Sequence, residues 1–119
     1  MEENLYWYKA KVMRAVDGDT IEVEVDHGMN IFSREHLRIK DINAPEMSGV
    51  KKDSEEYKRG LVVKQRVEQL LSQHPFVMIH TEKDKLTFNR YVADVYYQTG
   101  SGWTSLGDTL LTEGLVVKV

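Results

Sequence analysis

Cysteine is absent from this 119-residue sequence, which excludes disulfide frameworks and thiolate metal sites. Proline occurs only twice, and no apolar run is long enough to cross a bilayer. Basic residues are not in excess either, because 16 Lys and Arg stand against 19 Asp and Glu, for a net charge of −3. Tight, non-specific binding of nucleic acid through overall charge is therefore disfavoured, and any nucleic-acid role must come from a local basic cluster.

What is present is the composition of a globular protein, with 41% hydrophobic and 29% charged residues. The length suits one domain over residues 1–119. The first four residues lack the basic start and apolar run of a secretory signal. We therefore expect a cytoplasmic location by default, with secretion left open if a leader has been removed. We also expect a monomer with no membrane contact and no obligate protein partner.

Alternation of apolar and polar residues predicts β-strands. The clearest runs from Thr20 to Asp26, with Ile21, Val23 and Val25 on one face. The predicted strands cover residues 6–13, 20–26, 31–42, 76–81 and 91–97. Turn residues stand at 17–19, 27–30 and 100–102, between or after these strands.

Two helices are predicted from capping residues and apolar spacing. Ser54 is suited to cap a helix with acids in its first turn, which extends to about Gln73 because Pro75 forbids continuation. A short second helix is expected over residues 105–114, where Ser105 and Asp108 are spaced as a capping box.

The predicted order is three strands, a helix, two strands and a helix, followed by an apolar tail at 115–119. It makes the chain α+β, mainly β. It also predicts an OB-fold, a five-stranded Greek-key barrel with one helix between strands 3 and 4 and a short second helix. Other small α+β folds fit the same order nearly as well.

Four short motifs occur in a fixed order along the chain. They are Val16-Asp17-Gly18-Asp19-Thr20, an arginine at 38 eight residues before Glu46, Ala44-Pro45-Glu46, and Asn89-Arg90. With the later Glu113-Gly114-Leu115, they make residues 9–115 resemble the staphylococcal nuclease-like (thermonuclease) family, in a short form without its C-terminal helix. The resemblance implies an OB barrel that hydrolyses phosphodiester bonds of DNA and RNA with calcium (Ca²⁺) as cofactor.

The residues themselves suit that chemistry. A phosphodiester is a shielded anion, so attack by water needs cations to neutralise the developing charge and a base to take a proton. Arg38 and Arg90 can bind phosphate oxygens through planar forks, and Glu46 is the candidate general base. Asp19 is an anionic ligand for a hard cation. The resemblance implies the same four roles and adds the backbone carbonyl of Ala44 as a metal ligand. Taken singly, each residue is more often an ordinary turn, strand or loop residue.

Asn43 departs from the family pattern, which usually has a second metal-binding aspartate there. An asparagine oxygen can still bind calcium as a third ligand, but one unit of charge is lost, so weaker metal binding is expected. Asp41 lies two residues earlier and is not a clean substitute.

The expected substrate contacts also depart from the family. Phe88 replaces a tyrosine and loses a phosphate-facing hydroxyl, and the sequence stops at Val119, before the family's nucleotide-stacking tyrosines. Substrate binding should then be weaker or come from other residues. Those considered are Trp7, Tyr8, Tyr57, Phe88, Lys83 and Lys85.

Three functions remain open. The first is a calcium-dependent nuclease, which the joint presence of a candidate base and a metal carboxylate favours. The second is a catalytically weak or inactive nucleic-acid-binding OB module. The third is a structural or protein-interaction domain. The four histidines lack metal-site spacing and support none of the three.

Overall fold

The computed structural model describes residues 5–47, 49–87, 90–100 and 102–119, with side chains for all of these except 83–87. Within these ranges the main sheet has six strands in the order β3-β2-β1-β5-β6-β7, and a small second sheet joins β4 to β8. The strands are β1 Trp7–Asp17, β2 Thr20–Asp26, β3 Phe32–Ile39, β4 Ile42–Asn43, β5 Phe76–Thr87, β6 Arg90–Thr99, β7 Gly102–Ser105 and β8 Val117–Lys118.

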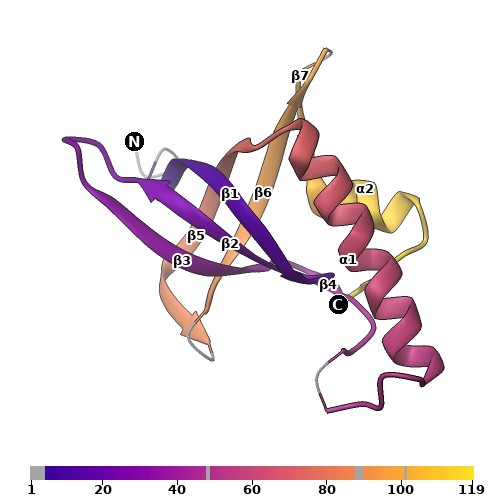
Figure 1. Ribbon diagram of the computed structural model, residues 1–119. Helices are drawn as coiled ribbons and strands as arrows, with labels where there is room; N and C mark the ends of the chain where they lie inside the picture. Colours follow the sequence, from indigo (N-terminus) through magenta and orange to yellow (C-terminus); the bar gives the residue numbers. More distant parts are fainter. Residues whose placement is uncertain (1–4, 48, 88–89, 101) are drawn as a thin grey trace.

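Pairing of β3 with β6 closes the sheet into a barrel (Figure 1). These two strands are parallel, with Leu37 opposite Tyr91 and Ile39 opposite Ala93. The later part of β6 pairs instead with β7, which lies outside the barrel. Strands β1, β2, β3, β5 and β6 therefore form the closed five-stranded barrel that the OB-fold prediction requires, and that prediction is confirmed.

Both predicted helices are present. α1 (Glu55–Gln73) begins where the Ser54 hydroxyl accepts the Tyr57 N–H at 3.2 Å, and it packs its buried side chains against the barrel beside β1 (Figure 1). α2 (Leu106–Thr112) begins in the same way at Ser105. An ion pair from Arg66 to Glu113, with two contacts of 2.7 and 2.8 Å, ties the two helices together. In the part of the chain described, neither helix is long and apolar enough to cross a membrane.

The core fills the barrel and the space under the helices. The predicted inward face of β2 is confirmed, because Ile21, Val23 and Val25 are all buried. The largest fully buried side chains are Ile21, Leu37, Ile39, Ile42, Ile79, Leu106 and Leu110. Burial of this apolar surface is the main stabilising contribution, and it fixes the register that positions the polar residues on the outer face.

One strand over residues 31–42 was the wrong prediction for this segment. β3 ends at Ile39, the chain turns at Asp41, whose φ of 65° is left-handed, and β4 begins at Ile42. Alternation from Leu37 and Ile39 would point Asp41 into the core, where an unpaired carboxylate is costly. The turn leaves Asp41 exposed and lets Ile42 take the buried position.

Four further features differ from the sequence prediction. β5 continues beyond residue 81 to Thr87, and β1 extends to Asp17. Residues 102–105 form β7 rather than leading directly into a helix, and the apolar tail contains β8, which pairs with β4. Strands of four and two residues are too short to show an alternating pattern in the sequence. They become strands through pairing with a neighbouring strand, which the sequence does not reveal.

Candidate active site

The turn between β1 and β2 delivers the first acidic residues. Gly18 is required there, because a Cβ atom would lie 2.6 Å from Cγ1 of Val63 and 2.7 Å from Cβ of Ala44. The Asp19 N–H donates to the Asp17 carboxylate at 3.1 Å, which holds the turn closed. Asp19 itself is only 9% exposed, so its carboxylate points into the protein rather than into solvent.

The Asp19 carboxylate gathers groups from two other segments. Its Oδ2 atom accepts the Ala44 N–H at 3.0 Å and lies 3.5 Å from Nη2 of Arg38. The same Arg38 nitrogen donates to the side-chain oxygen of Asn43. Arg38 therefore bridges two of the residues that the sequence predicts as metal ligands.

Arg90 joins this group through Thr20. Its Nη1 atom donates to the Thr20 hydroxyl at 3.0 Å, and Thr20 is opposite Arg38 in the pairing of β2 with β3. Thr20 also donates to the Asp19 carboxylate at 3.4 Å. We call this group the Asp19 cluster; its members are Asp19, Thr20, Arg38, Asn43, Ala44 and Arg90.

Glu46 lies apart from the Asp19 cluster. Its side chain is exposed, and its backbone N–H donates to the Glu56 carboxylate at 3.4 Å, at the start of α1. Among the described residues, its carboxylate makes no hydrogen bond or ion pair with any member of the cluster. The predicted base therefore sits on an exposed loop that adjoins the cluster in sequence through Ala44.

The predicted substrate-binding residues are scattered. Trp7 stacks on His80 on the outer face of the sheet, with ring centroids 4.3 Å apart, while Tyr8 lines a cavity at one end of the barrel. Tyr57 is in the first turn of α1. Phe88 lies outside the described residues, as do the side chains of Lys83 and Lys85.

The Asp17 carboxyl group has a raised pKa. Burial is the main cause of a rise in its pKa from 3.8 to about 6, and the adjacent Asp19 carboxylate contributes to that rise by hydrogen bonding and like charge. Sequence analysis assigned Asp17 only to a turn and gave Thr20 no role. Both residues belong to the motif at 16–20, so the motif indicated that this segment was functional. It did not indicate which side chains Asp17 and Thr20 would contact.

Calcium fits part of this arrangement. In the described ranges, no group of three or more His, Cys, Asp or Glu side chains converges as a metal site. The Asp19 and Asn43 oxygens do converge, since both face the cationic Nη2 of Arg38, and oxygen ligands suit a hard cation. Ala44 meets Asp19 through its N–H rather than its carbonyl. The fit therefore rests on Asp19 and Asn43.

Comparison with known proteins assigns the chain to a family. A search of curated proteins gave no match. The sequence model of a family described as staphylococcal nuclease homologue matches residues 36–119, well over half of the chain. The matched region contains Arg38, Asn43, Glu46 and Arg90, whereas Asp19 lies before it. With this match, and with a closed five-stranded barrel and two helices in the structure, the chain belongs to the staphylococcal nuclease homologue family.

Proposed function

We propose that this protein is a calcium-dependent nuclease that hydrolyses phosphodiester bonds of DNA or RNA. Family membership supports the broader class, a nuclease or nucleic-acid-binding module. The observation that carries the narrower proposal is the placement of two arginines around one nearly buried carboxylate, Asp19. Arg38 lies 3.5 Å from that carboxylate, and Arg90 is linked to it through the Thr20 hydroxyl. Guanidinium groups held on a strand and beside an acid are suited to bind a phosphate together with a cation.

In this proposal, Arg38 and Arg90 hold the non-bridging oxygens of the phosphate. Their charge stabilises the five-coordinate state, in which negative charge on those oxygens is greatest. Both side chains are fixed by hydrogen bonds before substrate arrives, so little reorganisation is needed at that point. Arg38 donates to the backbone carbonyl of Ile39 at 2.8 Å through Nη1, which leaves Nη2 to exchange Asn43 for a phosphate oxygen.

Asp19 and Asn43 would hold the calcium ion, which when bound polarises the phosphate as a Lewis acid. Glu46 takes a proton from the attacking water as the new P–O bond forms. The P–O bond to the leaving oxygen then breaks, that oxygen takes a proton from solvent water, and the exposed Glu46 releases its proton to solvent. Exposure of Glu46 gives water direct access to its carboxylate.

A nuclease assay with a calcium titration tests the proposal. We expect the wild-type protein to cleave a single-stranded oligonucleotide at millimolar calcium, and Glu46→Gln to reduce the rate by about 10² or more. Glu55→Gln, which removes another exposed acid nearby in the first turn of α1, is the matched control and should leave the rate unchanged. Absence of cleavage by pure wild-type protein would contradict the proposed activity.

The binding module is the second candidate, and one observation favours it. Because residue 43 is Asn, Asp19 is the one carboxylate among the described residues that contacts Arg38, so the Asp19 cluster has little negative charge to attract a divalent ion. A binding module should retain oligonucleotides with an affinity that falls as salt rises and does not respond to calcium. The same oligonucleotide, measured with and without calcium, separates the two functions.

A further inference from the structure

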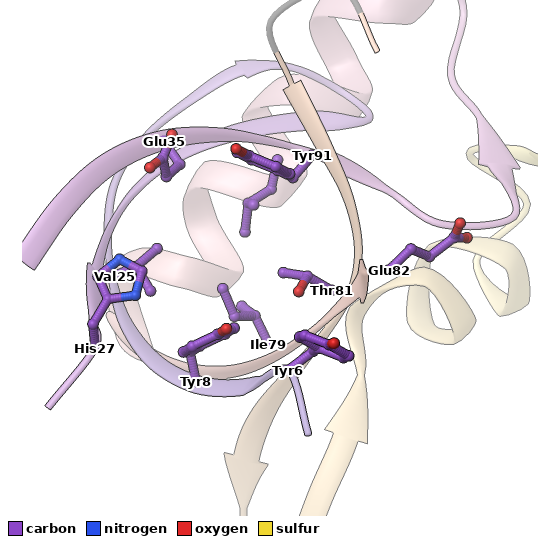
Figure 2. Close-up of a pocket in the computed structure, with 10 residues that line it drawn as sticks. Tyr6, Tyr8, Val25, His27, Glu35, Ile79, Thr81, Glu82 and Tyr91 are labelled. Carbon is purple, nitrogen blue, oxygen red and sulfur yellow. The ribbon is translucent and has the colours of Figure 1, made fainter. Parts of the chain in front are cut away.

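A cavity opens at the end of the barrel where β2 finishes and β3 starts. Its volume is about 170 Å³. Figure 2 looks into this opening, and the labelled side chains stand around it, with Tyr8 and Tyr91 on opposite sides. We call it the barrel-mouth cavity; it is lined by Tyr6, Tyr8, Val25, His27, Glu35, Leu37, Ile79, Thr81, Glu82 and Tyr91. It shares no residue with the Asp19 cluster.

The floor of the barrel-mouth cavity is apolar and its walls are aromatic. Val25, Leu37 and Ile79 on the floor are each at most 3% exposed. Tyr8 and Tyr91 lie opposite Ile79 and Leu37 in the strand pairing. The cavity therefore offers aromatic side chains above an apolar base, a setting in which electrostatic attractions are strengthened.

Tyr6 reaches the rim through an unusual backbone. Its φ of 66° is left-handed, which is rare for a bulky residue, and its carbonyl accepts the Thr81 N–H at 3.0 Å. Figure 2 shows its ring beside Thr81 at the opening. Backbone conformations of this kind often accompany ligand sites, because packing must hold them against their cost.

Glu35 adds a carboxylate that the described side chains do not neutralise. It occupies an inward position of β3, two residues before the buried Leu37, and it is half-buried. Among described residues its carboxylate has no hydrogen-bond or ion-pair partner, and no Lys or Arg lines the cavity. His27 bonds to the Ser33 hydroxyl at 2.6 Å, and Glu82 points away from the opening in Figure 2.

We propose that the barrel-mouth cavity binds an alkylated ammonium group. Aromatic rings attract organic cations through the negative charge of their faces, and Glu35 supplies the counter-charge. Nucleotides are disfavoured, because their phosphates would meet the Glu35 and Glu82 carboxylates, and no Lys or Arg stands among the described side chains of the lining. The cation can belong to a free quaternary amine or to a methylated lysine of a peptide, which present the same chemistry.

Binding of choline to the intact protein tests this, followed by the methyl NMR signals of Val25, Leu37 and Ile79. The control ligand is 3,3-dimethylbutan-1-ol, which has the shape of choline without its charge. We expect choline to shift these signals and the neutral analogue to bind at least about tenfold more weakly. Equal binding of the two would overturn the proposal, as would binding of adenine without binding of choline, or no binding of choline.

Variants test the residues. Glu35→Gln should weaken choline binding by about tenfold, as should Tyr8→Leu, whereas Tyr8→Phe, which keeps the ring, should bind as the wild type does. Glu24→Gln removes an acid from the outward face of β2 and is the control for net charge. Unchanged binding in a folded Glu35→Gln would refute the role of that carboxylate even if Tyr8→Leu fails to fold.

A second arm identifies the source of the cation. A short glycine and serine peptide carrying one trimethyllysine is compared with choline under the same conditions. Tighter binding of the peptide assigns the cavity to a modified protein, and equal or weaker binding assigns it to a free amine. Both results support the cation site, and neither depends on nuclease activity.

Discussion

The Asp19 cluster and the barrel-mouth cavity lie at opposite ends of β2, and they differ in the partners that surround their carboxylates. In the cluster, the Asp19 carboxylate accepts hydrogen bonds from Thr20 and Ala44 and has an arginine beside it. In the cavity, the Glu35 carboxylate has no such partner in the described part of the chain. The charged groups of the Asp19 cluster thus hold one another in place, whereas the barrel-mouth cavity leaves a carboxylate available to a ligand.

Substitution of Arg38 is expected to give the largest effect, because it should impair the Asp19 cluster and leave the barrel-mouth cavity intact. Arg38→Lys keeps the positive charge but loses the fork that binds the Ile39 carbonyl through Nη1 and leaves Nη2 for a phosphate oxygen, so we expect the calcium-dependent cleavage rate to fall by about 10² to 10³. Arg34→Lys is the matched control, since Arg34 is an exposed residue on the same face of β3. Choline binding at the other end of the barrel should not change in either variant. A loss as large in Arg34→Lys would show that the effect is not specific to the cluster.

Gly18 tests how tightly the cluster end is built. Gly18→Ala would place a methyl group against Val63 and Ala44 at less than 3 Å, and we expect it to reduce the free energy of unfolding by about 2 to 3 kcal/mol. Gly28→Ala, near the barrel mouth, has nothing within 4 Å and only a φ of 81° to oppose it, so its cost should be about 1 kcal/mol. Urea unfolding measures both. The reverse order would mean that the turn at Gly18 can move away from α1.

Much of the cluster could be predicted from the sequence, because its residues occur in short motifs. Asp19, Arg38 and Arg90 were expected near one another from motif order. Arg38 lies beside the Asp19 carboxylate, and Thr20 links Arg90 to it. The link from Arg38 to Asn43 could not be predicted, since it depends on the turn at Asp41 that ends β3 early.

The barrel-mouth cavity could not be predicted at all. Its aromatic residues come from β1, β6 and the segment before β1, and only strand register brings them together. In the sequence, Glu35 is one more acid in a strand with irregular alternation. Its inward position becomes clear only once Leu37 and Ile39 are known to face the core.

Asn43 is the next residue to change. Asn43→Asp restores a second carboxylate beside Asp19, and we expect calcium affinity to rise by about tenfold, since affinity follows ligand charge. Calorimetric titration with calcium measures this directly. Asp41→Asn, at an exposed left-handed position that asparagine tolerates, is the control and should leave the affinity unchanged. If Asn43→Asp has no effect on calcium binding or on the calcium dependence of cleavage, Asn43 does not face the metal.

Asp17 gives the smallest expected effect, and it depends on pH. Its folded-state pKa of about 6 lies above the ordinary 3.8, because burial and the neighbouring Asp19 disfavour its charged form. The folded protein therefore holds this proton more tightly than the unfolded chain does. The stability it contributes is fully present below about pH 4 and is lost as the pH rises through about 6.

Asp17→Asn should remove that loss, since the amide oxygen can still accept the Asp19 N–H. Because the side chain is only half-buried, solvent screening reduces the gain to about 1 kcal/mol at pH 8, with little difference at pH 4. Urea unfolding at the two pH values measures this, and an equal gain at both would exclude ionisation of Asp17 as the cause. Calcium should shrink the gain at pH 8 if it binds at Asp19, because a cation relieves the same repulsion between the two carboxylates. The Asp17 charge that lowers the stability of the turn would thus add to the negative potential that attracts a metal ion to Asp19.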